Sequence, residues 1–180
     1  IAVGTQRNWL STDASGLMVL FEASPDQLGR VRAAAARFGG HLDPLADGSL
    51  LVTLSGGTSA SDLASQAARC ALAMRMLLPS APIAIAMGRG EQASGKPGGA
   101  AIELAAELLT SARMLHVSGS APAPIRMDAT TALLLTPTFE VGGDEHGLLL
   151  CGERPPTEKP RLLLGKPTPF VGRERELSLL

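Results

Sequence analysis

The sequence has few aromatic residues and few charges. Aromatic side chains make up 3% of the 180 residues, with no tyrosine, and charged side chains make up 18%, with a formal net charge of −1. Nucleic acids and anionic membranes bind surfaces rich in Lys and Arg, so this composition excludes both as partners. No apolar run reaches the roughly 18 residues of a membrane-spanning helix. With 45% hydrophobic residues, the sequence predicts a globular domain with an aliphatic core.

Cysteine and histidine are also scarce. Cys70 falls on an apolar helical stripe and Cys151 in an apolar strand run, so both are predicted to be buried thiols, as in a reducing cytoplasm. His41, His116 and His146 lack the spacing of metal ligands, and each is interpreted as a surface or loop residue. The sequence therefore predicts a cytoplasmic protein without a metal ion or cofactor.

The order of strand and helix patterns predicts an α+β sandwich. Ser24, Ser59 and Asp128 stand where helices are expected to begin, and each is a good N-cap. The segment 94–99 lacks the spacing of a phosphate-binding loop and is interpreted as a flexible connection. Strands are predicted at 17–22, twice within 41–54 around an Asp47-Gly48 turn, at 82–87, 124–127, 139–141 and 148–151, and helices at 25–38, 60–78, 98–111 and 129–135.

Both ends of the chain differ in character from its middle. Residues 1–14 form a polar N-terminal extension, and 154–168 form a charged, proline-rich linker. The sequence begins with Ile1 and has no signal-peptide pattern. We therefore expect a fragment of a longer polypeptide.

Three segments carry a resemblance to a known family. They are Leu45-Ala-Asp-Gly-Ser-Leu-Leu-Val, Ile83-Ala-Ile-Ala-Met-Gly-Arg-Gly and Gly99-Ala-Ala-Ile-Glu-Leu-Ala-Ala-Glu-Leu. Together with the order of elements, they make residues 15–153 resemble the catalytic domain of class III adenylate and guanylate cyclases. The resemblance implies the ferredoxin-like α/β sandwich of that family.

The same resemblance implies two aspartates that hold two divalent cations. The first should lie two residues after Phe21, where the chain has Ala23. The neighbouring Glu22 is a poor substitute, because adjacent strand residues point to opposite faces. The second aspartate matches Asp47, a weak candidate for a metal ligand, since Asp-Gly is also a common turn pair.

The resemblance further implies a helix with the pattern G-D-x-V-N-x-A-x-R. Ala100 stands at the purine-selecting aspartate, Glu103 at the asparagine and Glu107 at the arginine. Each glutamate would repel a triphosphate by roughly 1–4 kcal/mol at a few ångströms. The two glutamates share one helix face, interpreted either as a solvated acidic surface or as a carboxylate pair at an interface. The resemblance therefore implies a degenerate site with no catalytic residue.

The C-terminal segment carries an independent resemblance. Phe170-Val-Gly-Arg-Glu-Arg-Glu-Leu177, within 169–180, resembles the lead-in to an AAA-like signalling ATPase domain. In related bacterial proteins a Ser/Thr kinase domain also lies upstream. This implies neighbouring ATPase and kinase domains of the same polypeptide as partners.

The leading hypothesis is a non-catalytic regulatory or interaction module of a multidomain bacterial signalling protein. Three alternatives remain open: a divergent cyclase completed by a partner chain, a sensor of nucleotides or other small ligands, and an accidental resemblance. A homodimer is expected for the longer protein more than for this fragment. Glu103 and Glu107 would repel each other across a symmetric pair unless Arg89 or Arg113 lies between them.

Overall fold

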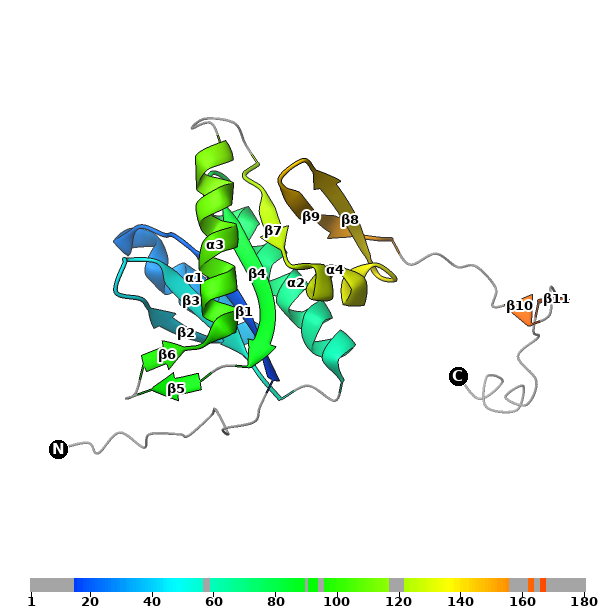
Figure 1. Ribbon diagram of the computed structural model, residues 1–180, viewed down its shortest axis with the longest axis horizontal. Coiled ribbons are helices and arrows are strands. Elements are labelled where there is room, and N and C mark those ends of the chain that lie inside the picture. The colour runs from blue at the N-terminus through cyan, green and yellow to red at the C-terminus, as the bar shows by residue number, and fades with distance from the viewer. Residues whose placement is uncertain are drawn as a thin grey trace, which may run out of the picture.

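The centre of the molecule is a seven-stranded sheet with the strand order β2-β3-β1-β4-β7-β9-β8 (Figure 1). The computed structural model describes residues 15–56, 59–89, 91–93, 96–116, 122–155, 162–163 and 166–167. The helices are α1 (Pro25–Arg37), α2 (Ala60–Leu77), α3 (Ala100–Leu115) and α4 (Ala129–Leu135). The strands are β1 (Ser15–Phe21), β2 (His41–Pro44), β3 (Leu50–Leu54), β4 (Ile83–Arg89), β5 (Glu91–Ala93), β6 (Lys96–Gly98), β7 (Ile125–Met127), β8 (Phe139–Asp144), β9 (Gly147–Glu153), β10 (Leu162–Leu163) and β11 (Lys166–Pro167).

Strand β1 lies in the middle of the sheet and is buried along its length. Leu17 pairs with Leu54 of β3 on one side and with Met87 of β4 on the other. Both pairings are antiparallel, and in the seven-stranded sheet only β4 and β7 run parallel. The mixed sheet and its helices confirm the predicted α+β sandwich.

The helices cover both faces of the sheet (Figure 1). Helices α1, α2 and α4 pack on one face, where alternate β1 residues such as Leu17, Val19 and Phe21 point. Helix α3 packs alone on the other face, against Met18 and Leu20. The period-two alternation of β1 therefore divides the core into two separate clusters.

The predicted helix starts are confirmed. Gln27 Oε1 accepts a hydrogen bond of 3.0 Å from the Ser24 amide at the start of α1. Ser59 Oγ accepts one of 3.1 Å from the Asp62 amide at the start of α2. Asp128 Oδ2 accepts hydrogen bonds from the amides of Thr130 and Thr131 in the first turn of α4. These bonds satisfy amides that have no partner within the helix, so local sequence sets where each helix begins.

Helix α3 sits very close to the sheet because both surfaces carry small residues. Its buried face consists of Ala101, Ala105, Leu109 and Ala112. A β-carbon added at Gly88 of β4 would lie 2.7 Å from that of Ala101, closer than side chains approach one another. Gly88 therefore fixes the height of the helix above the sheet.

The β8–β9 hairpin at the sheet edge pairs with β7 and is also held by three arginines. Arg126 of β7 is almost fully buried and makes two bonds to the Asp144 carboxylate, of 3.0 and 2.9 Å. Arg69 of α2 bonds Glu153, and Arg75 of α2 donates to the backbone carbonyls of β9. Bidentate guanidinium–carboxylate pairs of this kind fix orientation as well as position.

Some sequence predictions differ from the structure. The glycine-rich connection between β4 and α3 was expected to be a loop, but Glu91–Ala93 and Lys96–Gly98 pair as a short antiparallel ribbon. Cys151 is exposed rather than buried, because the alternation of β9 turns Leu150 inward and its neighbour outward. The uniformly apolar run Leu133–Leu135 predicts core residues, yet Leu133 of α4 is 77% exposed because successive helix positions face different directions.

The predicted extension 1–14 and ATPase lead-in 169–180 lie outside the described residues, as does most of the linker 154–168. Within the described ranges, no helix is both long enough and apolar enough to cross a membrane.

Candidate functional site

The end of β1 separates Glu22 from Ala23. Ala23 packs against the core cluster beneath α1 and α2, on the same face as Phe21. Glu22 is exposed and reaches α3, which covers the opposite face. The residue at the expected first metal position therefore has no side-chain ligand atom, and the carboxylate of the neighbouring Glu22 points to the other side of the sheet.

Asp47 lies in the turn between β2 and β3. Its Oδ1 accepts a bond of 3.0 Å from the Ser49 amide and one of 2.5 Å from the Ser49 hydroxyl. Gly48 has a φ of 88°, a conformation that favours glycine. The carboxylate is exposed, and its pKa lies below the usual value, mainly because of the Ser49 bonds and to a smaller degree because of the positive charge of Arg113. Asp47 thus shapes the turn while remaining ionised at neutral pH.

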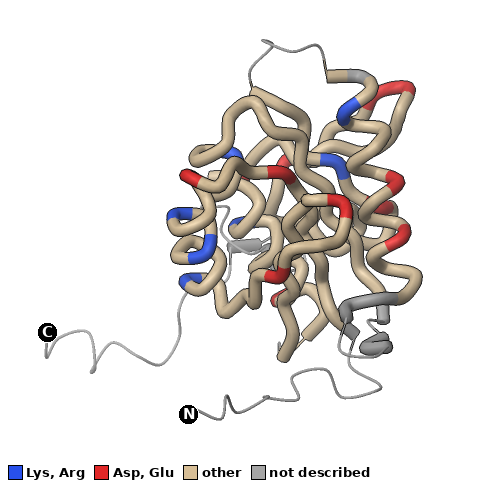
Figure 2. The backbone as a smooth tube through the Cα atoms, turned by 90° about the vertical axis from the view of Figure 1, so that its left-hand side faces the viewer, with Lys and Arg blue, Asp and Glu red and all other residues tan. Residues whose placement is uncertain are grey.

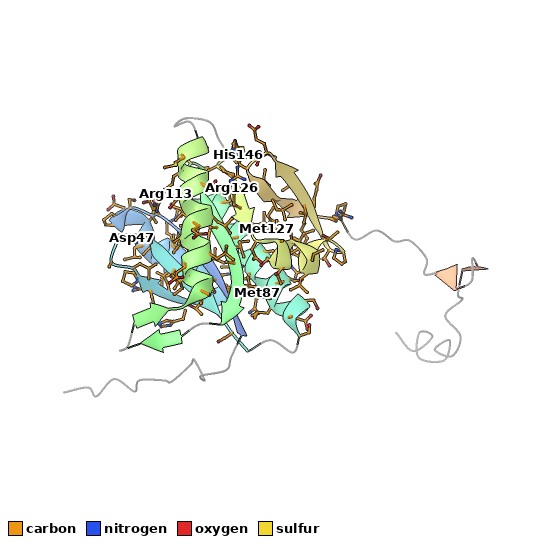
Figure 3. The ribbon with its side chains drawn as sticks, in the orientation of Figure 1. Asp47, Met87, Arg113, Arg126, Met127 and His146 are labelled. Atoms are coloured by element: carbon orange, nitrogen blue, oxygen red, sulfur yellow. The ribbon has the colours of Figure 1, made fainter. Side chains whose placement is uncertain are left out.

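Arg113, in the last turn of α3, is the cation of this region. Its Nη2 lies 2.8 Å from Glu22 Oε1, and its side chain is about one third exposed. Figure 3 shows Arg113 and Asp47 on the same side of the molecule. The Arg113 guanidinium therefore pairs with Glu22, and its charge contributes to a smaller degree to the lowered pKa of Asp47. Sequence reasoning considered Arg113 only as a counter-charge for Glu103 and Glu107.

The motif positions of α3 lie on its outer face. Ala100, Glu103 and Glu107 are exposed, opposite the alanines that contact the sheet. Ten residues separate Glu103 from Arg113, which is roughly 15 Å along a helix axis. A single chain therefore brings Glu22, Asp47 and Arg113 together and keeps Glu103 at a distance from them.

A shallow groove of about 560 Å³ runs between this outer face and the β8–β9 turn. It is lined by Ala106, Glu107, Thr110, Ser111, Met114 and His146. The side chain of Met114 is 83% exposed, so apolar surface is open to solvent here. Sequence reasoning did not find the groove, because His146 comes from a hairpin whose position depends on distant contacts.

The hairpin that contributes His146 is held by a buried charge. Arg126 is 2% exposed, and its bonds, together with one from the His146 amide, lower the pKa of Asp144 to about 2. An arginine between Ile125 and Met127 in a short buried strand was the sequence signal for this pair. We interpret the pair as structural, because Arg126 donates to both carboxylate oxygens of Asp144 and leaves neither of them unpaired.

The remaining sequence candidates are scattered. His41 Nε2 lies 3.3 Å from Asp43 Oδ1 on β2, and His146 Nε2 lies 3.2 Å from Glu145 Oε1 in the hairpin turn. His116 is the C-cap of α3. In the part of the chain that the structure describes, no three His, Cys, Asp or Glu side chains converge in a way that would hold a metal ion. Cys70 is buried in α2, and burial raises the pKa of its thiol to about 12.

The fold is that of adenylyl and guanylyl cyclase domains. The guanylyl cyclase Cya2 is 15% identical and superposes with a TM-score of 0.58, over 83% of this chain and 98% of that one. The dimeric guanylyl cyclase domain of the RhoGC fusion protein from the aquatic fungus Blastocladiella emersonii is 12% identical, with a TM-score of 0.60, over 78% and 96%. The adenylyl cyclase CyaB from P. aeruginosa is 17% identical, with a TM-score of 0.53, over 81% and 98%.

The sequence matches no protein-family model and no curated protein. At identities of 12 to 17%, the likeness to the solved structures is one of fold.

Proposed function

We propose that this domain is a non-catalytic regulatory module with a cyclase fold, and that it docks neighbouring domains of a multidomain bacterial signalling protein. One observation carries the proposal. The guanidinium of Arg113 pairs with Glu22 at 2.8 Å and also acts on Asp47, so a side chain supplies the positive charge that metal ions supply in a class III cyclase.

The residues present do not fit two divalent cations. Mg²⁺ requires oxygen ligands in near-octahedral geometry, usually one or two carboxylates with water and phosphate. Ala23 offers no oxygen, Glu22 is paired with Arg113, and one oxygen of Asp47 already accepts two bonds from Ser49. A cation placed here would also be repelled by the positive charge of Arg113.

The charges on the outer face of α3 also support a non-catalytic domain. Glu103 and Glu107 are exposed and have no ion pair among the described residues, so their charges face outward. A nucleotide triphosphate approaching this face would be repelled by both. The acidic edge of the groove disfavours a nucleotide sensor for the same reason.

A cyclase assay tests the proposal. The purified 180-residue chain should form no cyclic nucleotide from ATP or GTP in Mg²⁺ or Mn²⁺. Cyclic nucleotide that disappears in the Asp47→Ala variant would overturn it. A thermal-shift measurement with ATP and GTP tests the nucleotide sensor, and the proposal expects no stabilisation.

A second candidate is a cyclase active only with a partner chain. It is favoured by Asp47, which stays exposed and ionised, and by the roughly 15 Å between Glu103 and Arg113, since a second chain would have to supply the remaining groups. Mixing this chain with a candidate partner domain tests it. Activity that appears only in the mixture, and that Asp47→Ala removes, would favour this candidate over the docking module.

A further inference from the structure

Helix α3 carries an exposed stripe, here called the α3 stripe, which consists of Glu103, Glu107, Thr110 and Met114. Their spacings of four, three and four residues place them on one side of the helix. All four are exposed, and they lie opposite the alanines that contact the sheet. The stripe spans roughly 16 Å, about three helical turns.

The stripe has an acidic half and an apolar half. Glu103 and Glu107 form the acidic half, and in the described ranges of the chain their carboxylates are exposed and make no ion pair. Met114, at the other end, is 83% exposed and lines the groove together with Ala106. An acidic segment followed by an exposed apolar side chain beside a hollow is the arrangement that a helix-in-groove contact uses.

No lysine or arginine in the described part of the molecule pairs with the carboxylates of the α3 stripe. Arg113 is the basic side chain of α3, and it is bound to Glu22 on another side of the helix. The hairpin adds Glu145, which is 85% exposed and whose Oε1 lies 3.2 Å from His146 Nε2. Figure 2 shows acidic residues along the right-hand edge of the molecule, with most of the basic residues towards the left.

We propose that the α3 stripe and the adjoining groove bind a basic amphipathic helix of a protein partner. Lysine or arginine side chains of that helix face Glu103 and Glu107, and an apolar side chain enters the groove beside Met114. A second copy of this chain is a poorer occupant, because a symmetric contact would bring the same carboxylates together. The inference deepens the proposed docking role by naming the kind of partner, and it rests on that role.

Peptide binding to the 180-residue chain tests this inference. The probe is a synthetic amphipathic peptide of about five helical turns, with lysine on one face and leucine on the other. A peptide of the same composition in scrambled order and one with glutamate for lysine serve as controls. Calorimetry measures affinity, and amide chemical shifts locate the site. We expect the amide chemical shifts of residues 103–114 and of the β8–β9 turn to change on binding. The affinity should fall as the salt concentration rises, because salt screens the charges.

Substitutions distinguish peptide binding at the α3 stripe from nonspecific binding elsewhere on the protein. Glu103→Gln and Glu107→Gln should each weaken binding about two- to fivefold, as expected for exposed ion pairs. Met114→Ala should weaken it about fivefold. Asp26→Asn, an exposed carboxylate in α1, is the matched control and should leave binding unchanged.

Four outcomes would overturn the inference: no binding, equal binding of the scrambled peptide, shifts confined to α1 and α2, or a wild-type dimer in sedimentation that Met114→Arg dissociates. The measurement uses no nucleotide. A failure here is therefore distinct from a failure of the non-catalytic proposal, which the cyclase assay decides.

Discussion

Arg113 and Glu22 join the last turn of α3 to the end of β1 through an ion pair of 2.8 Å. Ninety-one positions separate them in the sequence, yet the fold places them beside the turn that carries Asp47. The pair connects the helix on one face of the sheet to the end of β1, on the face opposite Ala23.

Ser49 and Arg113 should lower the pKa of Asp47 to different degrees. Ser49→Ala should raise the pKa of Asp47 more than Arg113→Ala does, because the Ser49 hydroxyl bond is the largest of the effects that lower it. Carboxyl chemical shifts followed through a pH titration measure both changes. A larger effect from Arg113→Ala would show that the charge, rather than the turn, controls this carboxylate.

The close contact between α3 and β4 predicts a destabilising substitution. In Gly88→Ala the new β-carbon would lie 2.7 Å from that of Ala101, so α3 must move, and we expect the free energy of unfolding to fall by about 1–3 kcal/mol. Gly29→Ala in α1 is the matched control. An added β-carbon at Gly29 meets open space, so this substitution should raise the free energy of unfolding by about 0.5–1 kcal/mol. Urea denaturation measures both changes.

The two partners of the Arg126–Asp144 ion pair should differ in what their removal costs, because Arg126 is buried and Asp144 is exposed. Asp144→Asn leaves the buried Arg126 guanidinium without a counter-charge, so it should lower the unfolding midpoint clearly. Arg126→Met removes the buried charge and leaves Asp144 partly in solvent, and should change the free energy of unfolding by less than about 1 kcal/mol. Thermal unfolding at neutral pH compares them. Equal losses would mean that the bonds of Arg126, rather than its burial, dominate.

The same pair predicts how stability depends on acid. The pKa of Asp144 is about 2 in the folded protein, below its ordinary value of 3.8. Its contribution is therefore fully present above about pH 4 and is lost as the pH falls towards 2. Urea denaturation at a series of pH values should show a steeper loss of stability in this window for wild type than for Asp144→Asn. Parallel curves would contradict the assignment.

The two cysteines should react at very different rates. Cys151 is exposed, so a thiol reagent should modify it in the folded protein. Cys70 is buried and its thiol has a pKa of about 12, so it should react only after unfolding. Mass spectrometry with and without urea counts the modified thiols. The Cys151→Ser variant is the control and should give no modification under native conditions.

Local sequence predicted most of the fold because its signals act within a few residues. Ser59 and Asp128 begin helices by accepting bonds from nearby amides, and the Ser24 amide donates to the Gln27 side chain. The Asp47-Gly48 pair makes its turn in the same local way. These contacts form wherever the local sequence permits them.

Contacts between distant residues were not predictable in the same way. Arg113 with Glu22 and Arg126 with Asp144 each depend on how separate elements pack, and a pattern along the chain does not encode that packing. Cys151 was assigned to the core because its strand looks uniformly apolar, whereas only the pairing of β9 with β7 decides which side chains turn inward.

The two faces of α3 share no residues, and this separation has an evolutionary consequence. Gly88, Ala101 and Ala105 hold the helix against the sheet, whereas Glu103 and Glu107 lie on the solvent side. Substitutions on the outer side leave the inner contact untouched, so a lineage can exchange one surface chemistry for another without passing through unfolded intermediates. The inner contact thus sets the fold of this segment, and the outer side chains are free to determine what the surface binds.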